Sequence, residues 1–200
     1  MCTSVSADFR ELLIASLAER VTVSGFQLDA LLAHCELMLK WNRTINLTSI
    51  TKLEEVVERH YAESVFAASF LPEGPIRVVD VGSGPGFPGI PMAIMRPSAH
   101  VTVVESHQRK AVFLREAARG MANVRVVAKR AEDMEDRFDW LVSRAVSAED
   151  LRPVLGMARS MVLLTGSDGP PDVQGVEWDS VQLPWGRQRF VRIGRHGSFT

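Results

Sequence analysis

A glycine-rich loop directly after a β-branched run most constrains the fold of this 200-residue chain. The run at residues 76–81 reads IRVVDV, and the loop at residues 82–89 reads GSGPGFPG. A short apolar run that ends in glycine predicts a buried strand, and the apolar stretch IPMAIM after the loop predicts a helix. Glycines let a loop turn tightly and approach a ligand closely. We therefore expect an α/β fold with a ligand site at this turn.

Further β-branched and apolar runs follow the loop, separated mostly by helical stretches. They predict four more strands, at residues 101–105, 124–128, 138–144 and 161–165. We expect helices at residues 107–120, with Ser106 as the N-cap, and at residues 147–159. Pro153 must lie in the first turn of this last helix or bend it. The alternation of strands and helices predicts a parallel sheet with right-handed crossovers.

The end of the chain breaks this alternation. The segments VEWDSVQLP, at residues 176–184, and RQRFVRIG, at residues 187–194, both have the composition of strands, and no helical stretch separates them. The residues PWGR between them supply a tight connection. We therefore expect an antiparallel hairpin at one edge of the parallel sheet.

The first part of the chain is helical instead. The spacing of its apolar residues predicts three helices, at residues 6–20, 24–40 and 51–70. Ser24 is the expected N-cap of the second helix, and Ser49 or Thr51 that of the third. We therefore expect a small helical cap over residues 1–72 and a Rossmann-like domain over residues 73–200.

Composition excludes several classes of protein. Charged residues make up 24% of the chain and the mean hydropathy is +0.03, which argues against disorder and against a membrane protein. The N-terminus lacks the pattern of a secretion signal, and Cys2 and Cys35 form neither a disulfide framework nor a metal-binding spacing. We expect a cytoplasmic protein with no metal and no membrane contact. A formal net charge of −1 argues against binding bare nucleic acid by bulk charge, but leaves local basic surfaces open.

Glu105 makes the ligand site more specific. It ends the second predicted strand, so we expect it at the same edge of the sheet as the glycine loop. A carboxylate at that place can accept hydrogen bonds from both ribose hydroxyls of a nucleoside. Gly84, Gly86 and Gly89 formally match the dinucleotide pattern, so a nicotinamide-dependent oxidoreductase stays open as an alternative.

The offset of the glycines favours a different cofactor. In the dinucleotide pattern, the first glycine opens the turn after the strand. Here Gly82 takes that place, and Phe87 stands where the third glycine would fall. The offset favours an adenosyl nucleoside over a pyrophosphate. The expected terminal hairpin favours a class I methyltransferase, because that class ends with an antiparallel seventh strand.

The sequence is similar to the bacterial 16S ribosomal RNA methyltransferase G family, also called glucose-inhibited division protein B. The likeness covers roughly residues 27–165. It rests on Lys40-Trp41-Asn42, Asn46-Leu47-Thr48, Arg59-His60, Glu63-Ser64 and residues 78–97, 105–116, 131–132 and 143–145. The resemblance implies a class I fold, S-adenosyl-L-methionine as cofactor, and methyl transfer to N7 of a guanine in the 530 loop of 16S rRNA.

The resemblance also implies the residues of the site. Those at the cofactor would be Gly82, Gly84, Gly86, Phe87, Glu105, Ala131, Glu132 and Arg144. Glu105 would take the ribose, Ala131 and Glu132 would flank the adenine, and Arg144 would close the methionine end. Relatives usually carry Lys-Gly after the fifth strand, where this chain has Thr165-Gly166.

Guanine N7 suits the residues as a methyl acceptor. Its ring lone pair is nucleophilic and carries no proton, so the reaction needs alignment rather than a general base. Methylation at pyrimidine C5 would need a cysteine, and both cysteines precede the catalytic half. Exocyclic-amine enzymes carry an Asn/Asp-Pro-Pro-aromatic loop, where this chain has Ser143-Arg144-Ala145-Val146. Arg144 is our candidate for a positioning residue.

Local basic residues are the expected contacts to RNA. The candidates are Lys40, Arg59, His60, Arg187 and Arg189. We expect a monomer that acts on 16S rRNA or the small ribosomal subunit. Two further alternatives stay open: a class I methyltransferase acting on a small molecule or protein, and an RNA-binding module with a vestigial cofactor site.

Overall fold

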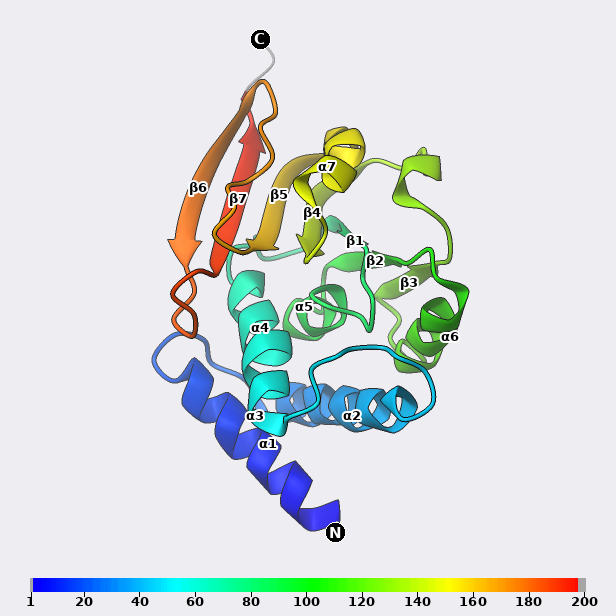
Figure 1. Cartoon of the computed structure of the whole chain (residues 1–200), viewed down its shortest axis with the longest axis vertical. Helices are drawn as coiled ribbons and strands as arrows, with labels where there is room; N and C mark the ends of the chain where they lie inside the picture. The colour runs from blue at the N-terminus through cyan, green and yellow to red at the C-terminus, as the bar shows by residue number, and fades with distance from the viewer. Residues whose placement is uncertain (1, 198–200) are drawn as a thin grey trace.

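A seven-stranded sheet forms the centre of the molecule (Figure 1). The computed structural model describes residues 2–197, with side chains from residue 6 onward. The strand order is β3-β2-β1-β4-β5-β7-β6. The strands are β1 (Arg77–Val81), β2 (His100–Val104), β3 (Val124–Val127), β4 (Phe138–Arg144), β5 (Ala158–Thr165), β6 (Val176–Gln182) and β7 (Phe190–His196).

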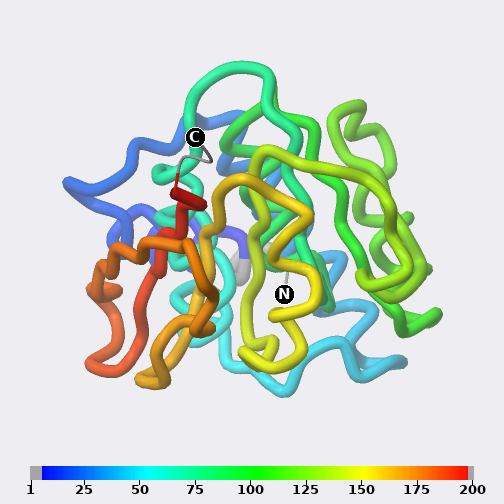
Figure 2. The backbone as a smooth tube through the Cα atoms, turned by 90° about the horizontal axis from the view of Figure 1, so that it is seen from above, coloured from blue at the N-terminus to red at the C-terminus, as the bar shows by residue number. Residues whose placement is uncertain are grey.

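Strand directions follow the sequence prediction. Strands β1 to β5 pair in parallel, whereas β7 is antiparallel to both β5 and β6. The parallel sheet and the terminal hairpin are thus confirmed, and Figure 2 shows the hairpin at the opposite edge from β3. Because β1, β2 and β4 are neighbours, the loops that follow them meet at one edge of the sheet.

The helices differ from the predictions mainly at their ends. They are α1 (Cys2–Leu17), α2 (Gly25–Asn42), α3 (Leu53–Val56), α4 (Glu63–Ala68), α5 (Gly89–Met95), α6 (Gln108–Ala117) and α7 (Ala148–Leu151), with a π-helical segment, Val57–Ala62, between α3 and α4. Ser24 caps α2 as expected, accepting from the Gln27 amide at 3.3 Å. The prediction of Ser49 or Thr51 as a cap is wrong, because Lys52 holds that position without a side-chain cap.

The helix predicted over residues 147–159 is also wrong in part. Only α7 is α-helical there, and the chain continues as a 3₁₀ helix over Arg152–Met157 before β5 begins at Ala158. Pro153 lies at the start of the 3₁₀ segment. Because proline has no amide hydrogen to donate and its ring crowds the preceding turn, a regular α-helix does not extend through it.

The helical cap and the sheet share one apolar core. The cap, α5 and α6 lie on one face, where Phe9, Leu31 and Tyr61 join a cluster with Val101 and Val162. A second cluster covers the other face beneath α7 and the 3₁₀ segment. The division at residues 72–73 falls between α4 and β1, and two separate domains stay a prediction. Of the helices within residues 2–197, none is long and apolar enough to cross a membrane.

Gly89 gives a first testable stability effect. A Cβ atom at this position would lie 2.6 Å from Asp80 Oδ2 and 2.8 Å from Val103 Cγ1, both inside the packed core. We expect Gly89→Ala to lower the free energy of unfolding by about 1–3 kcal/mol, through overpacking. Urea unfolding measures the change. Gly156→Ala is the control, since nothing lies within 4 Å of its added Cβ; equal effects of the two variants would contradict this packing.

Candidate active site

The glycine loop lies at the carboxyl edge of the sheet, between β1 and α5. The amides of Gly82 and Ser83 both donate to the Val104 carbonyl, at 3.1 and 3.0 Å. Gly82 has a φ of +71°, and a Cβ there would lie 2.7 Å from Val146 Cγ2. The residue must therefore be glycine for the loop after β4 to lie over the loop after β1.

Glu105 holds the loop from the end of β2. Its Oε2 accepts from the Gly84 amide at 2.9 Å, and its Oε1 accepts from the His107 amide at 2.7 Å. The side chain is buried. The prediction that Ser106 caps the next helix is wrong: His107 is the N-cap residue, and the carboxylate of Glu105 binds its amide.

Four of the predicted cofactor residues border one small cavity. It has a volume of about 220 Å³, and Gly82, Glu105, Ala131 and Glu132 are among its lining residues. Val146 also lines it, and separates it from a larger neighbouring cavity. The other four predicted residues are not among its lining residues. Gly84 is joined to it through the bond to Glu105, Gly86 and Phe87 are buried in the loop, and Arg144 lines the larger cavity.

Asp80, near the end of β1 and just before the glycine loop, is bonded to the far end of that loop. Its side chain is fully buried, and Oδ2 accepts from the Gly89 amide at 2.9 Å. The Ser83 hydroxyl donates to the Asp80 carbonyl at 3.0 Å. Burial raises the pKa of this carboxyl to about 7, against the opposing hydrogen bonds. Through these contacts Asp80 holds the glycine loop in place.

The raised pKa of Asp80 gives a pH dependence. Unfolded aspartate titrates near pH 4, so the contribution of Asp80 to stability declines as the pH rises from about 4 to about 7. Asp80→Asn removes this titration and keeps an oxygen for the Gly89 amide. We expect the stability of the variant relative to wild type to increase with pH in that window.

Urea unfolding at pH 4.5, 6 and 7.5 measures this difference. Burial lowers the pKa of His34 to about 4 and that of His60 to about 2, which acts on stability in the opposite direction. Both histidines are present in both proteins, so their effect cancels. Asp172→Asn, at an exposed position, is the control. A stability difference for Asp80→Asn that stays constant across the pH range would contradict the assignment.

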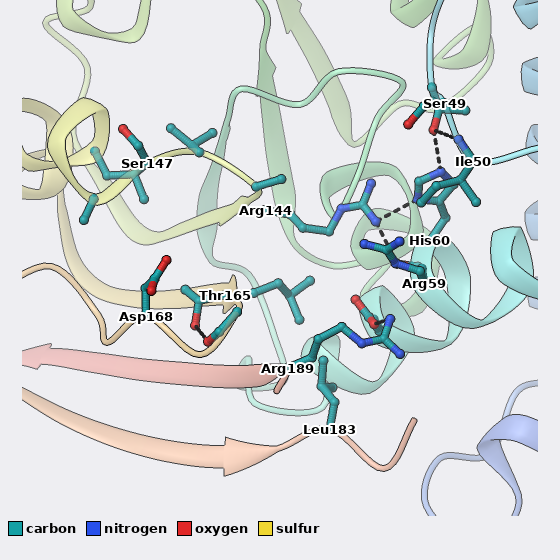
Figure 3. A pocket seen from close by; sticks show the side chains of 18 of the residues that line it. Ser49, Ile50, Arg59, His60, Arg144, Ser147, Thr165, Asp168, Leu183 and Arg189 are labelled. Carbon is teal, nitrogen blue, oxygen red and sulfur yellow. Dashed lines mark hydrogen bonds and ion pairs between the residues drawn. The ribbon is translucent and has the colours of Figure 1, made fainter. Parts of the chain in front are cut away.

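The larger cavity, of about 790 Å³, opens where the cap meets the sheet (Figure 3). Its wall comes from the loop before α3, the π-helical segment, the loops after β4 and β5, and the connection between β6 and β7. The residues that carry its chemistry are Thr48, Arg59, His60, Glu63, Arg144, Thr165 and Arg189. Arg144 points from the end of β4 toward the cap.

Arg144 is held by hydrogen bonds to the cap. Its Nη1 donates to the Arg59 carbonyl and to His60 Nδ1, both at 2.7 Å. Its guanidinium carbon lies 5.2 Å from the centre of the buried Phe87 ring. Burial lowers the pKa of Arg144 to about 10, so the group still carries its charge at neutral pH. Phe87 therefore links the glycine loop to the cap and to the end of β4.

Arg189 faces the same cavity from the terminal hairpin. Its Nη1 forms an ion pair with the buried Glu63, and its Nη2 lies 2.5 Å from Glu58 Oε1. Burial raises the pKa of Glu63 to about 7, although Arg189 and Arg144 act to lower it. These pairs fasten the hairpin to the cap, a role that the sequence did not reveal, because the partners lie 126 and 131 residues apart.

The expected RNA contacts lie in different environments. Lys40, Arg59 and Arg187 are exposed, whereas His60 is buried and Arg189 is engaged by carboxylates. Contact of these five residues with RNA stays a prediction. Thr48 and Glu63 were not assigned a role, although both lie in motifs that carry the resemblance. The residues next to Thr48 and Glu63 in the sequence do not indicate that these side chains bind His60 and Arg189.

A parallel sheet in this order, ending in an antiparallel hairpin, with a glycine loop after β1 and an acid after β2, defines a class I methyltransferase fold. Two solved structures share it. An S-adenosylmethionine-dependent methyltransferase from Aquifex aeolicus has a TM-score of 0.54 and 17% identity, over 70% of this chain and 93% of that one. Aeropyrum pernix fibrillarin, with natively bound S-adenosyl-L-methionine, has a TM-score of 0.51 and 17% identity, over 68% and 75%.

The chain belongs to the rRNA small subunit methyltransferase G family, whose model matches residues 27–158. Ribosomal RNA small subunit methyltransferase G of Xylella fastidiosa (strain M23) is 46% identical over 120 residues, 58% of this chain and 56% of the relative. The protein of that name from Nitrosomonas europaea is 44% identical over 129 residues, 62% and 59%. The matches thus span little more than half of each relative. The predicted fold class and the family's cofactor, S-adenosyl-L-methionine, are confirmed.

Proposed function

We propose that this protein transfers a methyl group from S-adenosyl-L-methionine to N7 of a guanine in the 530 loop of 16S rRNA. The observation that carries the proposal is the pair of adjoining cavities at the carboxyl edge of the sheet. The smaller has the residues for a nucleoside, and the larger holds Arg144 beside the loop that separates them. A cofactor in one cavity and a base in the other would meet at Val146.

The small cavity suits the adenosine part of the cofactor. A carboxylate has about four acceptor sites, and backbone amides occupy two of those on Glu105. Two remain for the two ribose hydroxyls, while Ala131 and Glu132 border the space for the adenine. When bound, the cofactor supplies an electrophilic methyl group on a sulfonium. We expect the glycine loop and Arg144 to orient the methionine end.

The larger cavity suits an acceptor that needs no general base. Both ring nitrogens of His60 already have hydrogen-bond partners, and Glu63 is paired with Arg189. Both groups are engaged by internal partners, so neither is positioned as a general base for a substrate, which fits guanine N7. The remaining donors of Arg144 could hold the O6 atom of the base or the cofactor carboxylate. Exposed Lys40, Arg59 and Arg187 could contact RNA phosphates.

Two assays test this function. Isothermal titration calorimetry should detect binding of S-adenosylmethionine and of its demethylated product, but not of NADH. Tritiated methyl transfer should label small ribosomal subunits from a strain that lacks this modification, and naked 16S rRNA tests whether the assembled particle is needed. NADH affinity without adenosylmethionine affinity would favour the oxidoreductase, and rRNA binding without transfer would favour a vestigial site.

We expect the active protein to be a cytoplasmic monomer.

A further inference from the structure

His60 lies where the cap, the glycine loop and the end of β4 meet. It belongs to the π-helical segment Val57–Ala62, and such segments occur frequently at functional sites. The residue is 2% exposed, and its ring stacks on Phe87, with the ring centres 4.6 Å apart and the planes inclined by 15°. Packing therefore holds the plane of the imidazole.

The hydrogen bonds of His60 fix its tautomer. Its Nδ1 lies 2.7 Å from Arg144 Nη1, and its Nε2 lies 3.0 Å from Thr48 Oγ1. A guanidinium can only donate, so Nδ1 must be the unprotonated nitrogen that accepts. The ring proton is then on Nε2, which donates to the Thr48 hydroxyl. A positively charged imidazole would instead place two donors face to face.

A neutral partner leaves the charge of Arg144 available. Among residues 2–197, Arg144 has no carboxylate within ion-pair distance, and Glu63 and Asp80 act on it only from farther away. Its protein hydrogen bonds all use Nη1. The donors on Nε and Nη2 thus stay free for a ligand. A carboxylate at position 60 would also hold the arginine, but it would neutralise the charge.

We propose that His60 is a positioning residue for methyl transfer: as the neutral Nε2-protonated tautomer, set by Thr48, it aims the Arg144 guanidinium at the ligand without neutralising it. The inference rests on the proposed function, in which Arg144 contacts the cofactor or the guanine. His60 touches neither and acts through Arg144 alone.

Three substitutions separate this role from simple packing. His60→Phe keeps the stack on Phe87 and removes the acceptor, so we expect kcat to fall about 10- to 100-fold, as for a misplaced active-site group. His60→Asn returns an oxygen near the place of Nδ1 and should recover a large part of this loss. Thr48→Val removes the partner that sets the tautomer and should have a smaller effect. His100→Phe, at an exposed histidine of β2, is the matched control.

A double-mutant cycle with Arg144→Met is the decisive kinetic measurement. If His60 acts through Arg144, then His60→Phe has no further effect on kcat in the Arg144→Met background. Thermal unfolding identifies any variant that fails to fold, and Thr48→Val supplies a second variant in that case. Multiplicative losses in the double variant, or a wild-type kcat for both His60→Phe and Thr48→Val, would overturn the proposal while leaving methyl transfer intact.

A spectroscopic readout is independent of activity. The ¹⁵N shifts of His60 in the full chain without ligand should show an unprotonated Nδ1 and a protonated Nε2 between pH 5 and 8. Arg144→Met should shift the Nδ1 resonance, because it removes the donor. A charged ring, or a proton on Nδ1, would overturn the proposal. Failure of wild-type protein to transfer methyl groups, with this tautomer observed, would instead count against the proposed function.

Discussion

Arg144→Met lowers the rate of methyl transfer by about a hundredfold or more, which is the scale lost with one preorganised donor at a reacting centre. The variant loses the charge and the free donors that face the larger cavity, and these cannot be replaced by a thioether. We expect only a small change in stability. Burial of this cation is unfavourable, as its lowered pKa shows, and the methionine stem can still pack on Phe87.

Single-turnover methyl transfer to small subunits measures the rate, and calorimetry measures the midpoint of unfolding. Arg137→Met is the matched control, because Arg137 is an exposed arginine just before the other end of β4. A rate near wild type in Arg144→Met would remove this residue from the site. A similar loss in the control would show that overall charge, rather than the position of Arg144, determines the rate.

Arg189→Met has the largest expected effect on stability. It leaves the buried Glu63 without its ion-pair partner and frees Glu58. Breaking a buried pair from one side costs about 3–5 kcal/mol, and we expect about 3 kcal/mol here because Arg189 keeps 21% exposure. The loss should be larger at pH 8 than at pH 6. Glu63 without its cation takes up a proton as the pH falls, and the cost of burying its charge then disappears.

Urea unfolding of Arg189→Met at the two pH values provides the measurement. Arg195→Met is the matched control on the same hairpin, since Arg195 pairs with Asp179 at the surface, with 58% and 72% exposure. An exposed pair contributes about 0–1 kcal/mol. Glu63→Gln added to Arg189→Met should recover part of the loss. Equal effects of the two arginine variants would contradict the buried pair.

The elements of the sheet could be predicted because their signals are local. The β-branched runs and the glycine loop specify where strands begin and turn, and Ser24 caps a helix from within three residues. The meeting of Gly82 and Glu105 could be predicted in the same way. They directly follow neighbouring parallel strands, and both line the smaller cavity. The predictions that failed depend on nearby groups. Glu105 binds the amide of His107, which takes the N-cap position expected for Ser106, and Pro153 limits α7.

The larger cavity could not be predicted, because its contacts join distant segments. His60 and Arg144 are 84 residues apart, and Arg189 meets Glu58 across 131 residues. Arg59, His60 and Arg189 appeared in the sequence only as basic residues, which suggested contact with RNA. The fold gives two of them internal partners. Charge identifies such residues in a sequence, but only packing decides whether the charge faces solvent or another side chain.

Nucleotide-resolution mapping of N7-methylguanosine in 16S rRNA tests the central claim most directly. Ribosomes are compared from cells with the protein, without it, and with the Arg144→Met variant. We expect one N7-methylated guanine in the 530 loop of the first sample, no such modification in the second, and a strongly reduced level in the third. An unchanged 530 loop in all three samples would contradict the proposed substrate, even though the family and the fold would stand.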